Sequence, residues 1–98
     1  MKCNGKPCTI IGTNGDDIIK GTTGRDVIHG LGGNDKIYGF GSDDIICGGD
    51  GDDKIQGLGG SDTLIGGNGN DLIEGGSGKD HIEGGSGKDH IEGGPGWD

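Results

Sequence analysis

The sequence predicts an all-β protein in which one short unit is repeated along the chain. Three observations indicate this class: a nine-residue period runs from Gly12 to Asp98, each period ends in three residues centred on an aliphatic side chain, and 28 of the 98 residues are glycine. The glycines permit tight turns, and the aliphatic residues form short strands. A helix is excluded because the apolar spacing is nine rather than about 3.6.

The composition limits both the size of the core and the choice of partners. Only 26% of the residues are hydrophobic and 3% are aromatic, so we expect one small domain with a thin core. The net charge of -9 repels phosphate groups and attracts cations, which argues against nucleic acid as a partner. No apolar run approaches the roughly 20 residues of a membrane span, so we expect no membrane insertion. The first residues, Met1 to Asn4, do not open a signal peptide.

Residues 1–11 form a non-repeat N-terminal segment in which we expect one strand, 9–11. Two of the three cysteines, Cys3 and Cys8, lie here, and Cys47 lies in the repeats. A bridge between Cys3 and Cys8 in an oxidising compartment and three unpaired thiols both stay open as interpretations. We expect no zinc site.

The repeats occupy residues 12–98 as nine complete blocks and an unfinished tenth. They read GTNGDDIIK, GTTGRDVIH, GLGGNDKIY, GFGSDDIIC, GGDGDDKIQ, GLGGSDTLI, GGNGNDLIE, GGSGKDHIE, GGSGKDHIE and GGPGWD. Position one is always glycine and position six is always aspartate. Position four is glycine except at Ser42. We expect the glycines at positions one and four to adopt positive φ.

The last three residues of each block form a strand. After 9–11, the expected strands are 18–20, 27–29, 36–38, 45–47, 54–56, 63–65, 72–74, 81–83 and 90–92. Side chains alternate along a strand, so only the central residue faces inward. These inward residues are Ile10, Ile19, Ile28, Ile37, Ile46, Ile55, Leu64, Ile73, Ile82 and Ile91.

The block GGxGxDxUx, with U a large apolar residue, resembles the nonapeptide of the RTX (repeats-in-toxin, hemolysin-type) calcium-binding proteins. The resemblance covers residues 12–98 and implies a parallel β-roll, a right-handed β-solenoid with two blocks in each 18-residue turn. A sheet forms each side, and calcium lies in the loops at both edges. The departures are Ser42 and five residues at position two, and we expect none of them to touch the aspartates. The five are Thr13, Thr22, Leu31, Phe40 and Leu58.

The resemblance implies multiple Ca²⁺ ions in two rows between stacked loops, with the aspartates of position six as ligands. These are Asp17, Asp26, Asp35, Asp44, Asp53, Asp62, Asp71, Asp80, Asp89 and Asp98. Aspartates 18 residues apart would share an ion. Calcium prefers oxygen ligands, which carboxylates and turn carbonyls supply. The alternative, in which the aspartates only cap turns, fits their strict phase less well.

Acidic side chains at positions three and five are expected to add to the electric field rather than to bind the ion. They are Asp16, Asp43, Asp50 and Asp52. Because the core is thin and the carboxylates repel one another, we expect the calcium-free chain to be unfolded and folding to be driven by calcium.

Other classes of function find little support in the sequence. No nucleophile and base stand out as a pair, and one surface repeats along the chain, so we expect no enzyme. His29, His81 and His90 occupy outward strand positions and are expected to be solvated. Ice binding would need a ladder of one residue type, but only Thr9 and Thr63 place threonine at position seven.

Two interpretations of the assembly remain. In the first, copies stack end to end into an extracellular filament, because the chain stops at Asp98 and Thr9-Ile10-Ile11 of the next copy would complete the tenth block. Neither end shows a polar cap, and Trp97 would be exposed on a lone molecule. In the second, the chain is a monomeric calcium-triggered folding or secretion module excised from a larger secreted RTX enzyme, toxin or adhesin.

One outer face has the longer apolar stretch and is expected to make lateral contacts between rolls. It carries Ile11, Val27, Ile45, Cys47 and Ile65. An extracellular location is implied by the resemblance and by the millimolar calcium found outside cells.

Overall fold

Strands are the only regular elements within residues 1–94, which are the residues that the computed structural model describes. This part of the chain therefore has no helix long and apolar enough to cross a membrane. The strands are β1 (Lys2–Cys3), β2 (Lys6–Pro7), β3 (Ile10–Ile11), β4 (Ile18–Lys20), β5 (Val27–His29), β6 (Lys36–Tyr38), β7 (Ile45–Cys47), β8 (Lys54–Gln56), β9 (Thr63–Ile65), β10 (Leu72–Glu74), β11 (His81–Glu83) and β12 (His90–Glu92).

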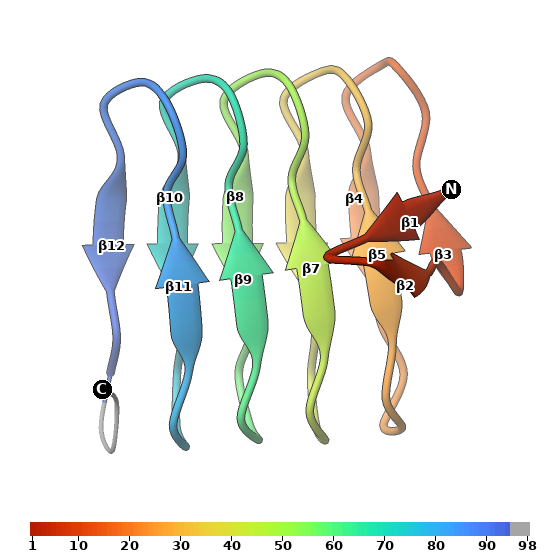
Figure 1. Ribbon diagram of the computed structural model, residues 1–98, viewed down its shortest axis with the longest axis vertical. Coiled ribbons are helices and arrows are strands. Elements are labelled where there is room, and N and C mark those ends of the chain that lie inside the picture. Colours follow the sequence, from red (N-terminus) through yellow and green to blue (C-terminus); the bar gives the residue numbers. More distant parts are fainter. Residues whose placement is uncertain (95–98) are drawn as a thin grey trace.

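The repeat strands form two five-stranded parallel sheets that face each other (Figure 1). One sheet has the order β12-β10-β8-β6-β4 and the other the order β11-β9-β7-β5-β3. Each strand pairs with the strand one turn away, so that Ile73 lies beside Ile55 on one side and Ile91 on the other. Two blocks therefore make one turn, which confirms the predicted parallel β-roll.

The core is a single file of aliphatic side chains between the two sheets. Seven inward residues are buried, namely Ile19, Ile28, Ile37, Ile46, Ile55, Leu64 and Ile73, and Ile10 and Ile82 pack against them partly buried. Ile91, on the last described strand, is 46% exposed. The prediction that position eight faces inward is confirmed along the middle of the roll.

From the third block onward the turns use positive φ at positions two and four, so the expectation of positive φ at position one is wrong. Most of these residues are glycine, but Leu31, Phe40 and Leu58 at position two have φ of 67°, 67° and 68°. Ser42 at position four has φ of 68°. L side chains rarely adopt this region, and the repeat geometry imposes it here.

An antiparallel hairpin, β1 and β2, precedes the roll. Its turn is Asn4-Gly5, with φ of 53° and 81°, and this dipeptide is typical of two-residue hairpin turns. The N–H of Cys8 donates to the carbonyl of Met1 at 3.0 Å and closes the hairpin. Two strands thus form in addition to the one expected within residues 1–11.

The hairpin lies across the outer face of β5 and β7 (Figure 1). There Cys3 forms a disulfide with Cys47, and Cys3 is 1% exposed. Cys8 is free. Neither interpretation of the cysteines was right, because β1 crosses β7 and brings Cys3 over a residue 44 positions away.

The hairpin also covers part of the apolar outer face. Val27, Ile45 and Cys47 lie beneath or beside it, and Lys6 and Pro7 border a hollow with Val27 and Ile45. The apolar stretch therefore already has an occupant within the same chain. The reason for expecting lateral contacts between rolls on this face no longer holds for these three residues.

Candidate metal centres in the loops

The loops stack in two rows, one along each edge of the roll (Figure 1). We call them the upper edge and the lower edge, as they stand in that view. The upper edge consists of the loops 12–17, 30–35, 48–53, 66–71 and 84–89. The lower edge consists of the loops 21–26, 39–44, 57–62 and 75–80, and the described start of a fifth. Asp98, in that fifth loop, lies outside the described residues.

The aspartates of position six point into the roll instead of into solvent. Seven of them are 1–4% exposed: Asp26, Asp35, Asp44, Asp53, Asp62, Asp71 and Asp80. Asp17 and Asp89, in the terminal loops of the upper edge, are half-buried. Burial of so many carboxylates in a small protein requires strong compensating interactions.

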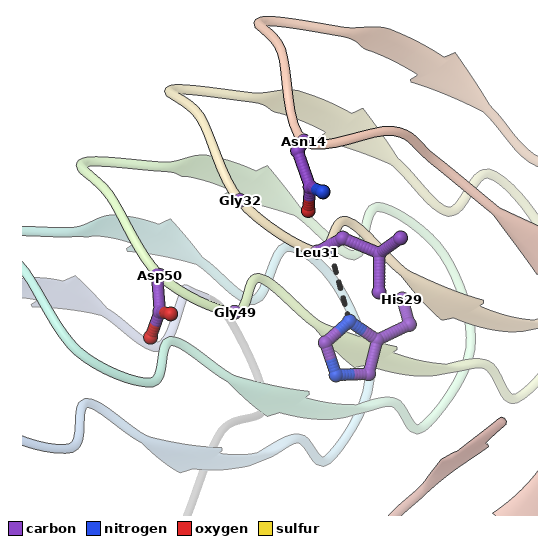
Figure 2. A pocket seen from close by; sticks show the side chains of 6 residues that line it. All are labelled: Asn14, His29, Leu31, Gly32, Gly49 and Asp50. Atoms are coloured by element: carbon purple, nitrogen blue, oxygen red, sulfur yellow. Dashed lines mark hydrogen bonds between the residues drawn. The ribbon is translucent and has the colours of Figure 1, made fainter.

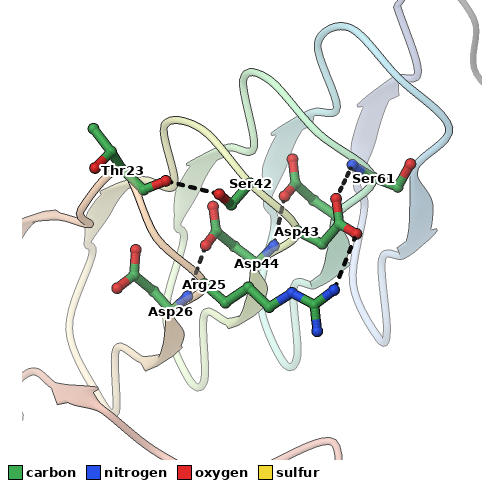
Figure 3. A network of polar contacts seen from close by, with 8 residues as sticks. Thr23, Arg25, Asp26, Ser42, Asp43, Asp44 and Ser61 are labelled. Carbon is green, nitrogen blue, oxygen red and sulfur yellow. Dashed lines mark hydrogen bonds and ion pairs between the residues drawn. The ribbon is translucent and has the colours of Figure 1, made fainter.

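One oxygen of each interior carboxylate is engaged by the backbone. The N–H of Asp17 donates to Oδ1 of Asp35 at 2.8 Å. The N–H of Asp26 donates to Oδ1 of Asp44, also at 2.8 Å (Figure 3). The same bond recurs at every further step up to Asp71 and Asp89, at 2.8–2.9 Å. The structure therefore brings together the aspartates that the sequence pairs at a spacing of 18.

The second oxygen, Oδ2, has no partner in five of these residues. Among the described residues no hydrogen-bond donor reaches Oδ2 of Asp35, Asp44, Asp53, Asp62 or Asp71, although each is buried. A buried carboxylate oxygen without a partner costs several kcal/mol at the order of magnitude. Such an atom is a candidate ligand for a cation.

The glycine at position one keeps open the space beside Oδ2. A Cβ at Gly30 would lie 2.6 Å from Oδ2 of Asp35 and 2.7 Å from the carbonyl oxygen of Gly48, one turn later. The same two contacts, at 2.5–3.0 Å, recur at each position-one glycine from Gly12 to Gly75. A carboxylate oxygen and a carbonyl oxygen thus converge on one small space in each loop from 12–17 to 75–80.

Burial raises the pKa of these carboxyls. The pKa of Asp53 rises to about 8 and that of Asp62 to about 7. Asp44 and Asp71 reach a pKa of about 6, and the pKa of Asp35 is also raised. The N–H donated to each carboxyl lowers its pKa and neighbouring aspartates raise it, but desolvation is the largest cause. Without a cation, the row of charges is therefore unfavourable near neutral pH.

The first loop of each edge satisfies its aspartate in another way. The hydroxyl of Thr13 donates to Oδ1 of Asp17 at 3.0 Å, and its N–H donates to Oδ2 at 2.7 Å. Thr22 makes the same two bonds to Asp26, at 2.9 and 2.7 Å. Residues 1–11 form a hairpin and one strand rather than a repeat turn, and the hydroxyls take the place of the N–H that such a turn donates elsewhere. The expectations that position two leaves the aspartates untouched and that neither end has a polar cap are therefore wrong for the N-terminal end.

The side chains of positions three and five bind the loops to one another. Oδ1 of Asp16 accepts the N–H of Asn34 at 2.7 Å. Oδ1 of Asp43 accepts the N–H of Ser61 at 2.8 Å (Figure 3). Asp50 accepts a bond from the Asn68 amide at 3.0 Å. These acidic side chains therefore have structural partners of their own.

One histidine is not solvated as expected. Nδ1 of His29 accepts the N–H of Leu31 at 3.0 Å beside a hollow on the upper edge (Figure 2). Burial lowers the pKa of His29, which the charge of Asp50 partly opposes. His81 and His90 are exposed, beside Glu83 and Glu92.

The donor set in the loops suits a hard cation. Within residues 1–94 no three side chains of histidine, cysteine, aspartate or glutamate gather at one point, so an ion would be held by paired aspartates and backbone carbonyls. Calcium takes about six to eight oxygen ligands and accepts carbonyls readily, whereas zinc prefers nitrogen and sulfur. The orphaned Oδ2 atoms and converging carbonyls fit calcium.

Comparison with known families agrees with this chemistry. The sequence model of the RTX calcium-binding nonapeptide repeat (4 copies) matches residues 11–46, 20–55, 38–73, 48–82 and 74–98. Together these matches leave out only the first ten residues, which contain the hairpin. No curated protein and no solved structure matches the chain significantly.

Proposed function

The chain belongs to the RTX calcium-binding nonapeptide repeat family, and from this premise we propose that it folds on binding a row of Ca²⁺ ions along each edge. The observation that carries the proposal is the set of buried Oδ2 atoms without a partner. Two positive charges per ion would neutralise adjacent carboxylates whose pKa is raised by burial. Calcium supplies the attraction that the thin apolar core lacks.

The proposed ligands are the position-six aspartates, with each interior residue shared between two ions. They are Asp17, Asp26, Asp35, Asp44, Asp53, Asp62, Asp71, Asp80, Asp89 and Asp98. Carbonyl oxygens of the position-one glycines border the same small space as Oδ2 and are proposed as further ligands. The role of the aspartate side chain is to fix the ion and to tie consecutive turns together.

Circular dichroism of the chain in calcium and in excess chelator tests this proposal. We expect a β-sheet signal in millimolar calcium and a disordered spectrum in chelator at pH 7.5, with full recovery when calcium is restored. Magnesium should not replace calcium, because it demands stricter octahedral geometry. An identical β-sheet signal under both conditions would contradict calcium-driven folding.

We assign the chain a binding and structural role rather than a catalytic one. Catalysis needs unlike groups that converge in a concave site, whereas this surface repeats one loop. We place its site of action outside the cell, where millimolar calcium would fill loops of modest affinity.

Stacking of copies end to end is the finer part of the proposal. Among the described residues no strand pairs with the outer edge of β11 or of β12, and Ile91 is 46% exposed. If the register continued, β12 would pair with β4 of the next copy. Ile91 would then cover Ile19, and Glu92 would face the oppositely charged Lys20. Such a contact does not close on itself and would propagate as a filament.

The monomeric module is a second candidate, and one observation favours it. Thr13 and Thr22 already satisfy Asp17 and Asp26 at the N-terminal end, as a cap would. Because these carboxylates already have hydrogen-bond donors, contact with a second copy would stabilise this end less.

Light scattering in millimolar calcium distinguishes the two candidates. A filament predicts growth in mass with protein concentration, loss of growth in Lys20→Glu, and recovery in the double variant Lys20→Glu with Glu92→Lys. A monodisperse monomer at high concentration would favour the module and reject the filament.

A further inference from the structure

The two edges of the roll differ in the charge that surrounds the position-six aspartates. At positions three and five the upper edge has three acidic residues and one basic residue: Asp16, Asp50, Asp52 and Lys88. The lower edge has one acidic and two basic residues: Asp43, Arg25 and Lys79. The charged residues directly before a position-six aspartate are Asp16, Asp52 and Lys88 on the upper edge, and they are Arg25, Asp43 and Lys79 on the lower edge. Their formal charges sum to -1 (-2 + 1) above and to +1 (+2 - 1) below.

The edges also differ in how firmly the loops are tied to one another. Along the upper edge the position-five side chain accepts the next turn's position-five N–H at every step. The bonds run from Asn34 to Asp16, Asp52 to Asn34, Asn70 to Asp52 and Lys88 to Asn70, at 2.7–2.8 Å. On the lower edge the described residues form one such bond, from Ser61 to Asp43. The Arg25–Asp43 ion pair there is 4.0 Å long and exposed, and such pairs contribute little.

A hollow on the upper edge is bordered by the side-chain oxygens of Asn14 and Asp50 and by no lysine or arginine. Gly32 has no side chain at position three, which leaves a gap between Asn14 and Asp50 (Figure 2). His29 borders this gap and uses Nδ1 to accept a backbone N–H, so its imidazole is neutral in this arrangement.

On the premise that the loops bind calcium as proposed above, we propose that the upper edge binds Ca²⁺ more tightly than the lower edge. Both edges contain buried Oδ2 atoms without partners, at Asp35, Asp53 and Asp71 above and at Asp44 and Asp62 below. The proposed ligands are therefore alike on both edges, and the difference in calcium affinity comes from the residues around them. Negative charge beside the ligands and loops already tied in place favour the upper edge.

Heteronuclear NMR of the ¹⁵N-labelled full chain, titrated with calcium buffers, measures the two edges separately. Backbone amides of the loops 48–53 and 57–62 serve as reporters for the upper and lower edge. As free calcium is lowered, we expect the lower-edge amides to leave their calcium-bound positions first, at about tenfold higher free calcium than the upper-edge amides, equivalent to about 1.4 kcal/mol. The roll should unfold only when the upper edge also loses its calcium. A single common midpoint for both sets would overturn the proposal.

Two charge variants test the cause. Asp52→Asn removes a charge but keeps the side-chain oxygen, and Asn34 and Asn70 show that an amide fits this ladder. It should weaken the upper edge several-fold and leave the lower edge unchanged. Lys79→Gln should strengthen the lower edge by a similar factor. Equal shifts of both edges in either variant would refute the assignment.

Failure of the premise has a different signature. If no amide responds to calcium, the calcium-binding function itself is wrong and the inequality of the edges falls with it. If all amides respond together, calcium binding stands and only the inequality is rejected.

Discussion

Glycines at different positions of the block have different structural roles. Gly30 at position one keeps a space open, because a Cβ there would lie 2.6 Å from Oδ2 of Asp35 and 2.7 Å from the Gly48 carbonyl. Gly24 at position four of the second block is unlike it, since its nearest neighbour would be the Thr22 hydroxyl at 3.7 Å. These two positions form a matched pair for substitution by alanine.

We predict that Gly30→Ala destabilises the calcium-bound roll by about 1–3 kcal/mol, the usual cost of overpacking. Gly24→Ala should leave stability unchanged or raise it slightly, because alanine restricts the unfolded chain. Urea unfolding in calcium measures both changes. Equal effects of the two variants would show that position one is not a space-keeping residue.

The carboxylate of Asp53 should contribute more to calcium-driven folding than the carboxylate of an exposed acidic residue. Asp53→Asn keeps an acceptor for the Asp35 N–H but removes the negative charge from the two proposed calcium sites that adjoin it. We predict that the free calcium required for half-folding rises about tenfold, equivalent to about 1.4 kcal/mol. Glu83→Gln on the outer face is the control and should shift the midpoint little. The midpoint is read by circular dichroism in calcium buffers.

Sequence and structure agree on the residues that have one fixed place in the block. The aspartates and inward aliphatic residues were predictable because a strict period gives each a constant environment. The roles of Thr13 and Thr22 were not predictable, because they depend on there being no preceding turn. The space at Gly30 depends on the carbonyl of Gly48, a contact between turns that the spacing of residues within one block does not reveal.

Among the elements, the N-terminal hairpin owes its position to the roll. Cys3 reaches Cys47 only when β7 is formed and β1 lies across it. In an unfolded chain Cys8 is five residues from Cys3, and the short loop favours that pair over one 44 residues apart.

We therefore predict that calcium selects the disulfide. Oxidation of the reduced chain in millimolar calcium should give Cys3–Cys47, and oxidation in chelator should give mainly Cys3–Cys8. Peptide mapping by mass spectrometry identifies the pairs, and Cys8→Ser should leave the calcium product intact. Formation of Cys3–Cys47 at the same yield without calcium would contradict the prediction.

The hairpin could have been recognised from its turn but not placed. Asn4-Gly5 is a strong local signal for a two-residue turn. Its docking on β5 and β7 depends on contacts between residues far apart in sequence, which a local signal does not contain. The strands of the roll were predictable because each one repeats the last.

At the scale of the whole molecule, protons should partly replace calcium. The raised pKa values, about 8 for Asp53, about 7 for Asp62 and about 6 for Asp44 and Asp71, mean that the folded chain binds more protons than the unfolded one. The stability that comes from this extra proton binding is fully present below the ordinary aspartate pKa of about 3.9. It is lost as the pH rises through the raised pKa values of the folded chain.

We predict that the calcium-free chain gains β-sheet signal when acidified from pH 8 to about pH 4, while the calcium-bound chain shows no such gain. Circular dichroism in chelator across this range measures the effect. A calcium-free spectrum that does not change between these limits would indicate that the aspartates are not buried as described.

The architecture with two blocks per turn makes the roll sensitive to whether its length changes by an even or an odd number of blocks. Inserting 18 residues adds one turn and leaves every later residue on its own edge and sheet. Inserting nine residues exchanges upper and lower edges for everything that follows, and the outer faces with them. The last two complete blocks, 75–83 and 84–92, are identical in sequence. Duplicating one such block keeps the contacts within each block but moves all later residues to the opposite edge and sheet. Lineages of this protein should therefore vary in length by whole turns wherever the edges have distinct tasks, and one-block changes should be confined to the C-terminal end.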